Sequence, residues 1–167
     1  MLQQGNLEEA LAEIDRVVSI FGQSVEALEL QVEIRGAIVA KNRSPEEEAQ
    51  IWLDRGNQFY DASDFENAII SCDKAIEFKH DSHAAWYNRG CSLARLGYDD
   101  EAIASYDKAI DFKHDFHEAW NGRSASLANL CRYEEALDSY DEASKSKNNK
   151  HEVLHNRGSL LEKIGRL

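Results

Sequence analysis

The chain repeats itself every 34 residues, and this periodicity limits the folds it can adopt more than any other feature. When the sequence is compared with itself at that shift, residues of the same type superimpose throughout the central part of the chain. The coinciding sets are Trp52, Trp86 and Trp120; Arg55, Arg89, Arg123 and Arg157; Ala68, Ala102 and Ala136; Ala75, Ala109 and Ala143; and Asp73, Asp107 and Asp141. A period of this length is typical of repeat proteins, in which each unit buries its apolar face only against its neighbours.

Each repeat contains two amphipathic helices. Trp86, Gly90 and Leu93 recur at the three- and four-residue spacing of one helical face, and Ala102 and Tyr106 mark a second helix after a short turn. Proline, which breaks helices, occurs once in 167 residues. The sequence therefore predicts antiparallel helix pairs, with small residues where two helices approach closely and buried tryptophan and tyrosine rings beside them.

These residues, at this spacing, resemble the tetratricopeptide repeat family. The resemblance is carried by Trp52, Trp86 and Trp120, by Gly56 and Gly90, by Phe59, Leu93 and Leu127, by Tyr106 and Tyr140, and by the two alanine sets above. It implies an all-α fold, a right-handed α-solenoid of antiparallel helix pairs with about nine helices, irregular at its N-terminal end. The chain departs from the family at the junctions between repeats, where the usual proline is replaced by His80, His114 and Asn148.

The repeat pattern divides the chain into three expected parts. The parts are a partial, irregular pair of helices over 1–45, three tandem repeats over 46–148 (about 49–82, 83–116 and 117–150), and a last helix over 149–167. This last helix is either the start of an incomplete fourth repeat or a cap.

The N-terminal part breaks the period. Residues 7–21 are expected to form a second helix without its first, followed by a long helix over about 24–41. Only 20 residues separate Gly36 from Gly56, so one helix of a repeat is absent there. Because the two helix layers of a solenoid alternate, we expect a kink or a differently packed helix pair near residues 41–46.

The charge of the chain excludes several classes of partner. With 19 lysines and arginines against 31 aspartates and glutamates, the net charge is −12. An acidic surface repels the phosphate backbone of nucleic acids and does not form a polybasic membrane anchor. No apolar run approaches the roughly 20 residues of a membrane span. The N-terminus lacks the features of a signal peptide, and three cysteines do not make a disulfide framework, so a cytoplasmic protein is expected.

The sequence gives only weak evidence for catalytic or metal-binding residues. The histidines fall in H-x-x-H pairs, but the pairs recur with the repeat and lie at its turns, which explains them without a metal. A cysteine nucleophile requires an adjacent base, and the pattern supplies none. We therefore expect no catalytic residues, no metal and no cofactor. The residues concerned are His80, His83, His114, His117, His151 and His155, and Cys72, Cys91 and Cys131.

The recurring arginines keep step with the recurring aspartates. Strict co-repetition favours ion pairs between helices, because a partly buried guanidinium needs a partner. The alternative is that exposed arginines capture an anion.

The resemblance also implies a binding surface. In the family, the first helices of the repeats line a concave groove that holds a peptide or a helix of a partner. Asparagine both donates and accepts hydrogen bonds, so it can hold a peptide backbone whatever its side chains are. The alternative is a solvated polar face without a ligand. The groove residues carried over to this chain are Asp54, Asn57, Asp61, Tyr87, Asn88, Cys91, Arg95, Asn121, Asn129, His155, Asn156 and Ser159.

One ligand class of the family does not fit these residues. Members that grip the C-terminal carboxylate of a chaperone combine two asparagines with cationic side chains. Asn57 and Asn88 match the asparagines, but Leu53, Glu118 and Gly122 stand at the cationic positions. An acidic tail is therefore disfavoured, and the negative charge of the chain favours a neutral or basic segment.

The expected function is a non-catalytic scaffold that binds a protein or peptide in this groove. Two alternatives stay open. The terminal helices expose apolar faces that allow self-association, for instance as a homodimer. The other alternative is that the chain is a regulatory segment of a larger enzyme or signalling protein.

Overall fold

The computed structural model describes residues 4–21, 31–38, 42–145 and 150–165. Within these ranges the chain is built of α-helices joined by short turns, so the all-α expectation is confirmed. No helix among the described residues is both long and apolar enough to cross a membrane. The helices are α1 (Gln4–Phe21), α3 (Pro45–Asp61), α4 (Phe65–Phe78), α5 (His83–Arg95), α6 (Asp99–Phe112), α7 (His117–Asn129), α8 (Tyr133–Ala143) and α9 (Lys150–Lys163), with one more helical segment over 31–38.

The chain forms two units, Met1–Ser44 and Pro45–Leu167. In the first unit α1 begins at Gln4, earlier than expected. Of the long helix expected over 24–41, the structure describes residues 31–38 as helical. The rest of that helix and part of the kink expected near 41–46 lie outside the described residues. Asp15 of α1 accepts a hydrogen bond from Gln31, 16 residues later, and contacts Arg35 at 3.4 Å.

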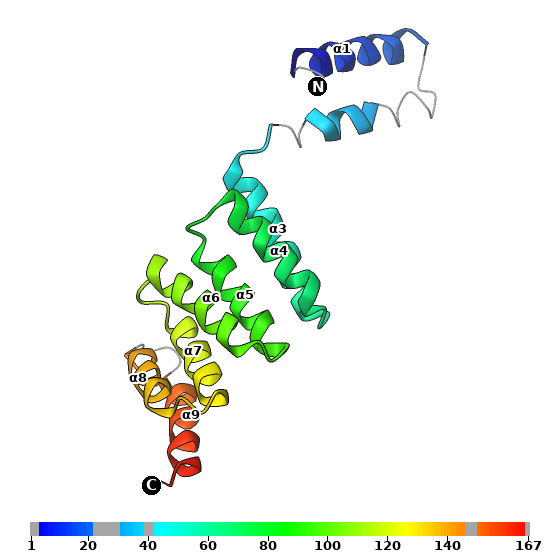
Figure 1. Ribbon diagram of the computed structural model, residues 1–167. Helices are drawn as coiled ribbons and strands as arrows, with labels where there is room; N and C mark the ends of the chain where they lie inside the picture. Colours follow the sequence, from blue (N-terminus) through cyan, green and yellow to red (C-terminus); the bar gives the residue numbers. More distant parts are fainter. Residues whose placement is uncertain (1–3, 22–30, 39–41, 146–149, 166–167) are drawn as a thin grey trace. The chain divides into compact units, whose positions relative to one another are not determined.

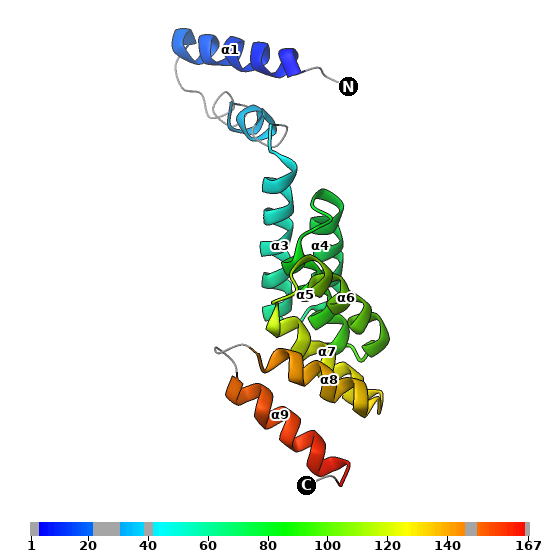
Figure 2. The ribbon, with the colours of Figure 1, turned by 90° about the vertical axis from the view of Figure 1, so that its left-hand side faces the viewer.

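The second unit is a stack of helix pairs in chain order. Figures 1 and 2 show α3 beside α4, α5 beside α6, and α7 beside α8, with α9 following α8. The second helix of each pair also packs against the first helix of the next pair. This is the stacking of an α-helical repeat solenoid, in which neighbours cover the apolar stripe that one pair leaves exposed.

The sequence sets the ends of the helices locally. The Asp64 carboxylate caps α4 by accepting from the Asn67 backbone N–H at 3.3 Å, and the Ser82 hydroxyl caps α5 in the same way. Gly97 ends the α5 turn with a φ of +82°, a conformation that favours glycine. Cys131 adopts the equivalent conformation, with a φ of 59°, at the corresponding turn after α7.

The core consists of small and medium-sized side chains. Both helices of each pair contribute buried alanines, and Tyr106, Leu127 and Tyr140 fill the spaces between them. The sequence predicted buried tryptophans, but all three are only half-buried, so this prediction is wrong. At the junctions between successive pairs, Trp86 Nε1 donates to the His80 carbonyl at 2.8 Å and Trp120 Nε1 to the His114 carbonyl at 3.0 Å.

Candidate functional site

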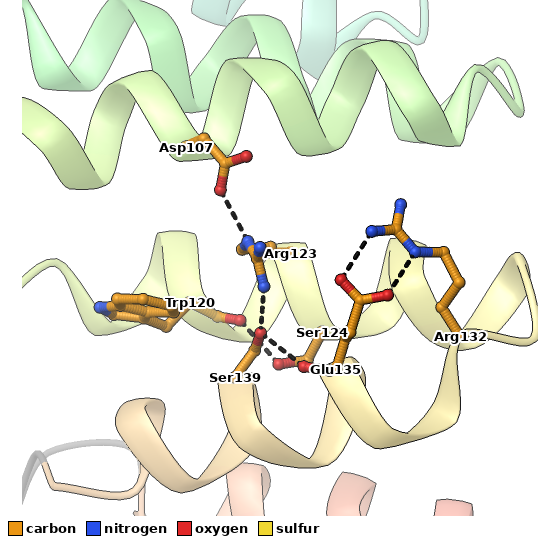
Figure 3. Close-up of polar contacts among 7 residues, drawn as sticks. All are labelled: Asp107, Trp120, Arg123, Ser124, Arg132, Glu135 and Ser139. Carbon is orange, nitrogen blue, oxygen red and sulfur yellow. Dashed lines mark hydrogen bonds and ion pairs between the residues drawn. The ribbon is translucent and has the colours of Figure 1, made fainter.

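Three of the four recurring arginines, Arg89, Arg123 and Arg157, form ion pairs between helices, and we call these three the arginine ladder. Figure 3 shows Arg123 of α7 between the two neighbouring second helices. Its Nε donates to Asp107 Oδ1 of α6 at 2.7 Å, and its Nη1 donates to Ser139 Oγ of α8 at 2.5 Å. The Ser139 hydroxyl in turn donates to the Glu135 carbonyl. One guanidinium therefore joins three helices.

The same contacts recur along the unit. Arg89 donates to Asp73 and to Ser105, each at 2.7 Å, and Arg157 donates to Asp141 at 2.7 Å. The sequence predicted the aspartates but not the serines. Ser71, Ser105 and Ser139 also recur at 34, so a signal for them was present in the sequence.

A cavity of about 380 Å³ lies between the first helices α3 and α5. Of its lining residues, five were predicted for the groove and one, Tyr60, was missed. Tyr60 lies one helical turn after Asn57, so helical spacing offered a signal for it. The lining residues are Asn57, Tyr60, Asp61, Tyr87, Asn88 and Cys91.

Two asparagines span this cavity. Asn88 Nδ2 of α5 donates to Asn57 Oδ1 of α3 at 2.5 Å. A carboxamide carries two N–H donors and an oxygen with two lone pairs. One mutual hydrogen bond therefore leaves this amide pair with donors and acceptors for the backbone of a ligand.

Tyr87 and Cys91 form an uncharged inner wall of the cavity, and further uncharged side chains contact them. Tyr106 Oη donates to Cys91 Sγ at 3.6 Å, and the Tyr87 ring lies 6.0 Å from the Tyr106 ring and 5.0 Å from that of Phe116. Burial raises the pKa of Tyr87 and of Tyr106 far above the ordinary tyrosine value. Burial also raises the pKa of the Cys91 thiol, although hydrogen bonds with the two tyrosines oppose the shift. Cys91 therefore stays a thiol near neutral pH and lacks the character of an activated nucleophile.

The cavity lining carries one negative charge and no positive charge. Asp61 is exposed at the end of α3 and is the one charged residue of the lining. Asp54, further back on α3, accepts a hydrogen bond from Gln50 at 2.8 Å. Arg95 lies outside the lining, with its guanidinium 4.7 Å from the Phe65 ring centroid and 5.9 Å from that of Tyr60.

A second concave region of about 230 Å³ lies among α7, α8 and α9. It includes Asn129, Asn156 and Ser159 of the predicted groove. Asn156 Nδ2 donates to Asn121 Oδ1 at 3.4 Å, so a contact between asparagines of successive first helices occurs here too. Its lining residues are Ala125, Ala128, Asn129, Tyr140, Asn156, Ser159, Leu160 and Lys163.

The remaining predicted groove residues line neither cavity. These are Asp54, Arg95, Asn121 and His155. Asn121 still reaches the second region through Asn156, and His155 is an exposed side chain of α9.

The histidines at the turns take part in ring packing. The His80 ring lies edge-on to Phe112 at 5.3 Å, His83 to Phe116 at 5.2 Å and His114 to Trp120 at 5.9 Å. Burial, with smaller contributions from Lys113 and Lys79, lowers the pKa of His83. Among the described residues, no group of three or more histidine, cysteine, aspartate or glutamate side chains is placed to hold a metal ion.

Comparison with known proteins agrees with this architecture. Residues 83–115, which span α5 and α6, match the family model described as tetratricopeptide repeat. No curated protein sequence matches the chain significantly.

Three similar solved structures cover most of the chain. The first TPR of Spaghetti (RPAP3) bound to HSP90 peptide SRMEEVD has a TM-score of 0.69 at 18% identity, over 72% of this chain and 95% of that one. The TPR2B domain of yeast Sti1 in its Hsp70 complex has a TM-score of 0.66 at 23% identity, over 70% and 98%. The crystal structure of MamA has a TM-score of 0.68 at 16% identity, over 98% and 81%. At these identities the likeness establishes a shared fold.

Proposed function

We propose that the second unit of this chain, in which residues 83–115 match the tetratricopeptide repeat model, is a non-catalytic scaffold that binds a protein segment along the face of its first helices. The observation that carries the proposal is the Asn57–Asn88 pair, which spans a cavity between α3 and α5. The contact between Asn121 and Asn156 places a second amide pair further along the same series of helices. Paired amides at intervals suit an extended backbone, which offers donors and acceptors at regular spacing.

Similar structures support a role in peptide binding. The Spaghetti domain is bound to an HSP90 peptide, and the Sti1 domain is in a complex with Hsp70. The present chain has Leu53, Glu118 and Gly122 where a carboxylate grip requires cations. We therefore propose a neutral or basic segment as its ligand, not an acidic tail. We further propose that 49–82, 83–116 and 117–150 are the repeat units, of which the middle one coincides with the matched residues 83–115.

The proposal is tested by removing the amides without removing the fold. Asn88→Ala combined with Asn121→Ala deletes one asparagine from each pair. A partner captured from the source cell by the intact chain should bind this double variant at least about tenfold more weakly, because the backbone loses hydrogen-bond partners. Thermal unfolding should stay nearly unchanged.

Asp138→Ala is the matched control, because Asp138 is an exposed residue of the second helix α8 and lines neither cavity. Equal affinity of the wild-type chain and the double variant for the partner would remove the groove from consideration.

A second candidate function is self-association. Leu154 of α9 stands in the register of the tryptophans, and 48% of its surface is exposed. An exposed apolar side chain on a terminal helix suits contact with another copy. Sedimentation at high protein concentration separates the two candidates, because a monomer eliminates self-association.

A further inference from the structure

The cavity between α3 and α5 combines two kinds of group that act together on a cation. Tyr60 and Tyr87 supply aromatic surface, and Asp61 supplies a carboxylate. The faces of tyrosine rings attract cations, and the attraction grows when the cation loses water. No lysine or arginine occurs among the residues that line this cavity.

The surroundings of the cavity strengthen this preference. The thiol and phenol groups of its inner wall are neutral, so they do not compensate the Asp61 charge. A carboxylate ligand would lie beside the Asp61 carboxylate, and no cation of the lining would neutralise either carboxylate. Such contact between like charges is unfavourable. A purely apolar guest would cover Asn57, Asn88 and Asp61 without satisfying their polar atoms.

Arg95 shows how the adjacent aromatic rings receive a guanidinium. Its Cζ lies 4.7 Å from the Phe65 ring centroid and 5.9 Å from that of Tyr60. Both distances fall within the roughly 6 Å of cation–π contact. Since Arg95 is exposed and shares Tyr60 with the cavity, its charge opposes the entry of a second cation.

We propose that this cavity receives the side chain of an arginine from an extended partner segment, whose backbone is held by Asn57 and Asn88. The inference rests on the proposed function of the groove and specifies its ligand class. Arginine fits better than lysine, because a planar guanidinium stacks on a tyrosine ring while donating two parallel hydrogen bonds to a carboxylate.

The test is a selection of random linear peptides on the full chain, followed by affinity measurements on the enriched sequences. Enriched peptides should contain arginine and should lose binding with Asn88→Ala. Replacement of that arginine by citrulline, which keeps the shape and removes the charge, should weaken binding about tenfold. With the Asp61→Asn variant, the same replacement should matter less than about twofold.

Two further variants sharpen the test. Asp138→Asn makes the same change of charge on α8, away from the cavity, and should leave the citrulline effect at its full size. Arg95→Gln should tighten the arginine peptide, because it removes a competing cation from Tyr60.

The remaining outcomes separate the two proposals. The arginine site is wrong if peptides that depend on Asn88 lack a basic residue, or if their citrulline forms bind equally well. In both cases the groove function still stands. If no enriched peptide depends on Asn88, both the groove function and the arginine site are wrong.

Discussion

Tyr106 occupies space that two glycines leave open on successive first helices. A Cβ added at Gly90 of α5 would lie 2.8 Å from Tyr106 Cε1, and one added at Gly122 of α7 would lie 2.7 Å from its Cζ. Both distances are too short for carbon atoms, and the ring is almost completely buried, with 2% of its surface exposed. The tyrosine therefore fixes how closely α5 and α7 approach it.

Substitution of Gly122 by alanine should destabilise the protein although alanine favours helices. The strain of an overpacked core costs about 1–3 kcal/mol, which exceeds the gain of up to about 1 kcal/mol from helix propensity. Gly158→Ala is the matched control, since nothing lies within 4 Å of its added Cβ. Chemical denaturation should show Gly122→Ala less stable and Gly158→Ala more stable than the wild type. Equal gains in stability for both variants would show that the Tyr106 ring does not need the space.

The sequence could not predict this role of Gly122. Gly90 belongs to the repeating set, whereas Gly122 stands 34 residues after Asn88 and so breaks the pattern. From the sequence it resembled a missing cation of a peptide grip. Its packing role depends on a tyrosine from another helix, and that contact exists only in three dimensions.

At the scale of the helices, periodicity was enough to predict the pairing. A period of 34 places each aspartate 16 residues before an arginine, and all three of these pairs close at 2.7 Å. The serine partners lie a further 16 residues on, which is visible in the sequence only once the guanidinium is known to reach both neighbours. The tryptophans are less buried than the sequence suggested, and each ring is covered by an arginine guanidinium, as for Arg123, whose Cζ lies 5.8 Å from the Trp120 centroid.

A double-mutant cycle on Arg123→Ala and Asp107→Ala should reveal coupling between α6 and α7. We expect a coupling free energy of about 1 kcal/mol, because the guanidinium is mostly buried while the carboxylate remains half-exposed to screening water. The control cycle is Arg132→Ala with Glu135→Ala, an exposed pair at the N-terminal end of α8, where Arg132 directly precedes the helix (Figure 3). That pair lies within one segment and should show a smaller coupling. If denaturation gave the two cycles the same value, the ladder would add nothing to the stacking of helices.

At the scale of the whole chain, the two units differ in how they are held together. Among the residues whose side chains the structure describes, every buried one lies between Ala49 and Leu160, within the second unit. The first unit is held by contacts such as Asp15 with Gln31 and Arg35, between half-buried or exposed side chains. The stability of a solenoid is nearly a sum of contacts between neighbouring helices, so a stack with its own core does not depend on helices outside that stack.

A protein that consists of residues 45–167 alone should therefore fold and keep its cavity. Its thermal midpoint, followed by circular dichroism, should lie within a few degrees of that of the full chain, because each helix pair retains the neighbours that bury it. A shorter protein over 79–167, which lacks α3 and α4, is the control. It loses one wall of the cavity and the Asp73 partner of Arg89, and it should unfold at a lower temperature and no longer bind the groove ligand. An unfolded 45–167 chain would show instead that the first unit supplies contacts on which the solenoid depends.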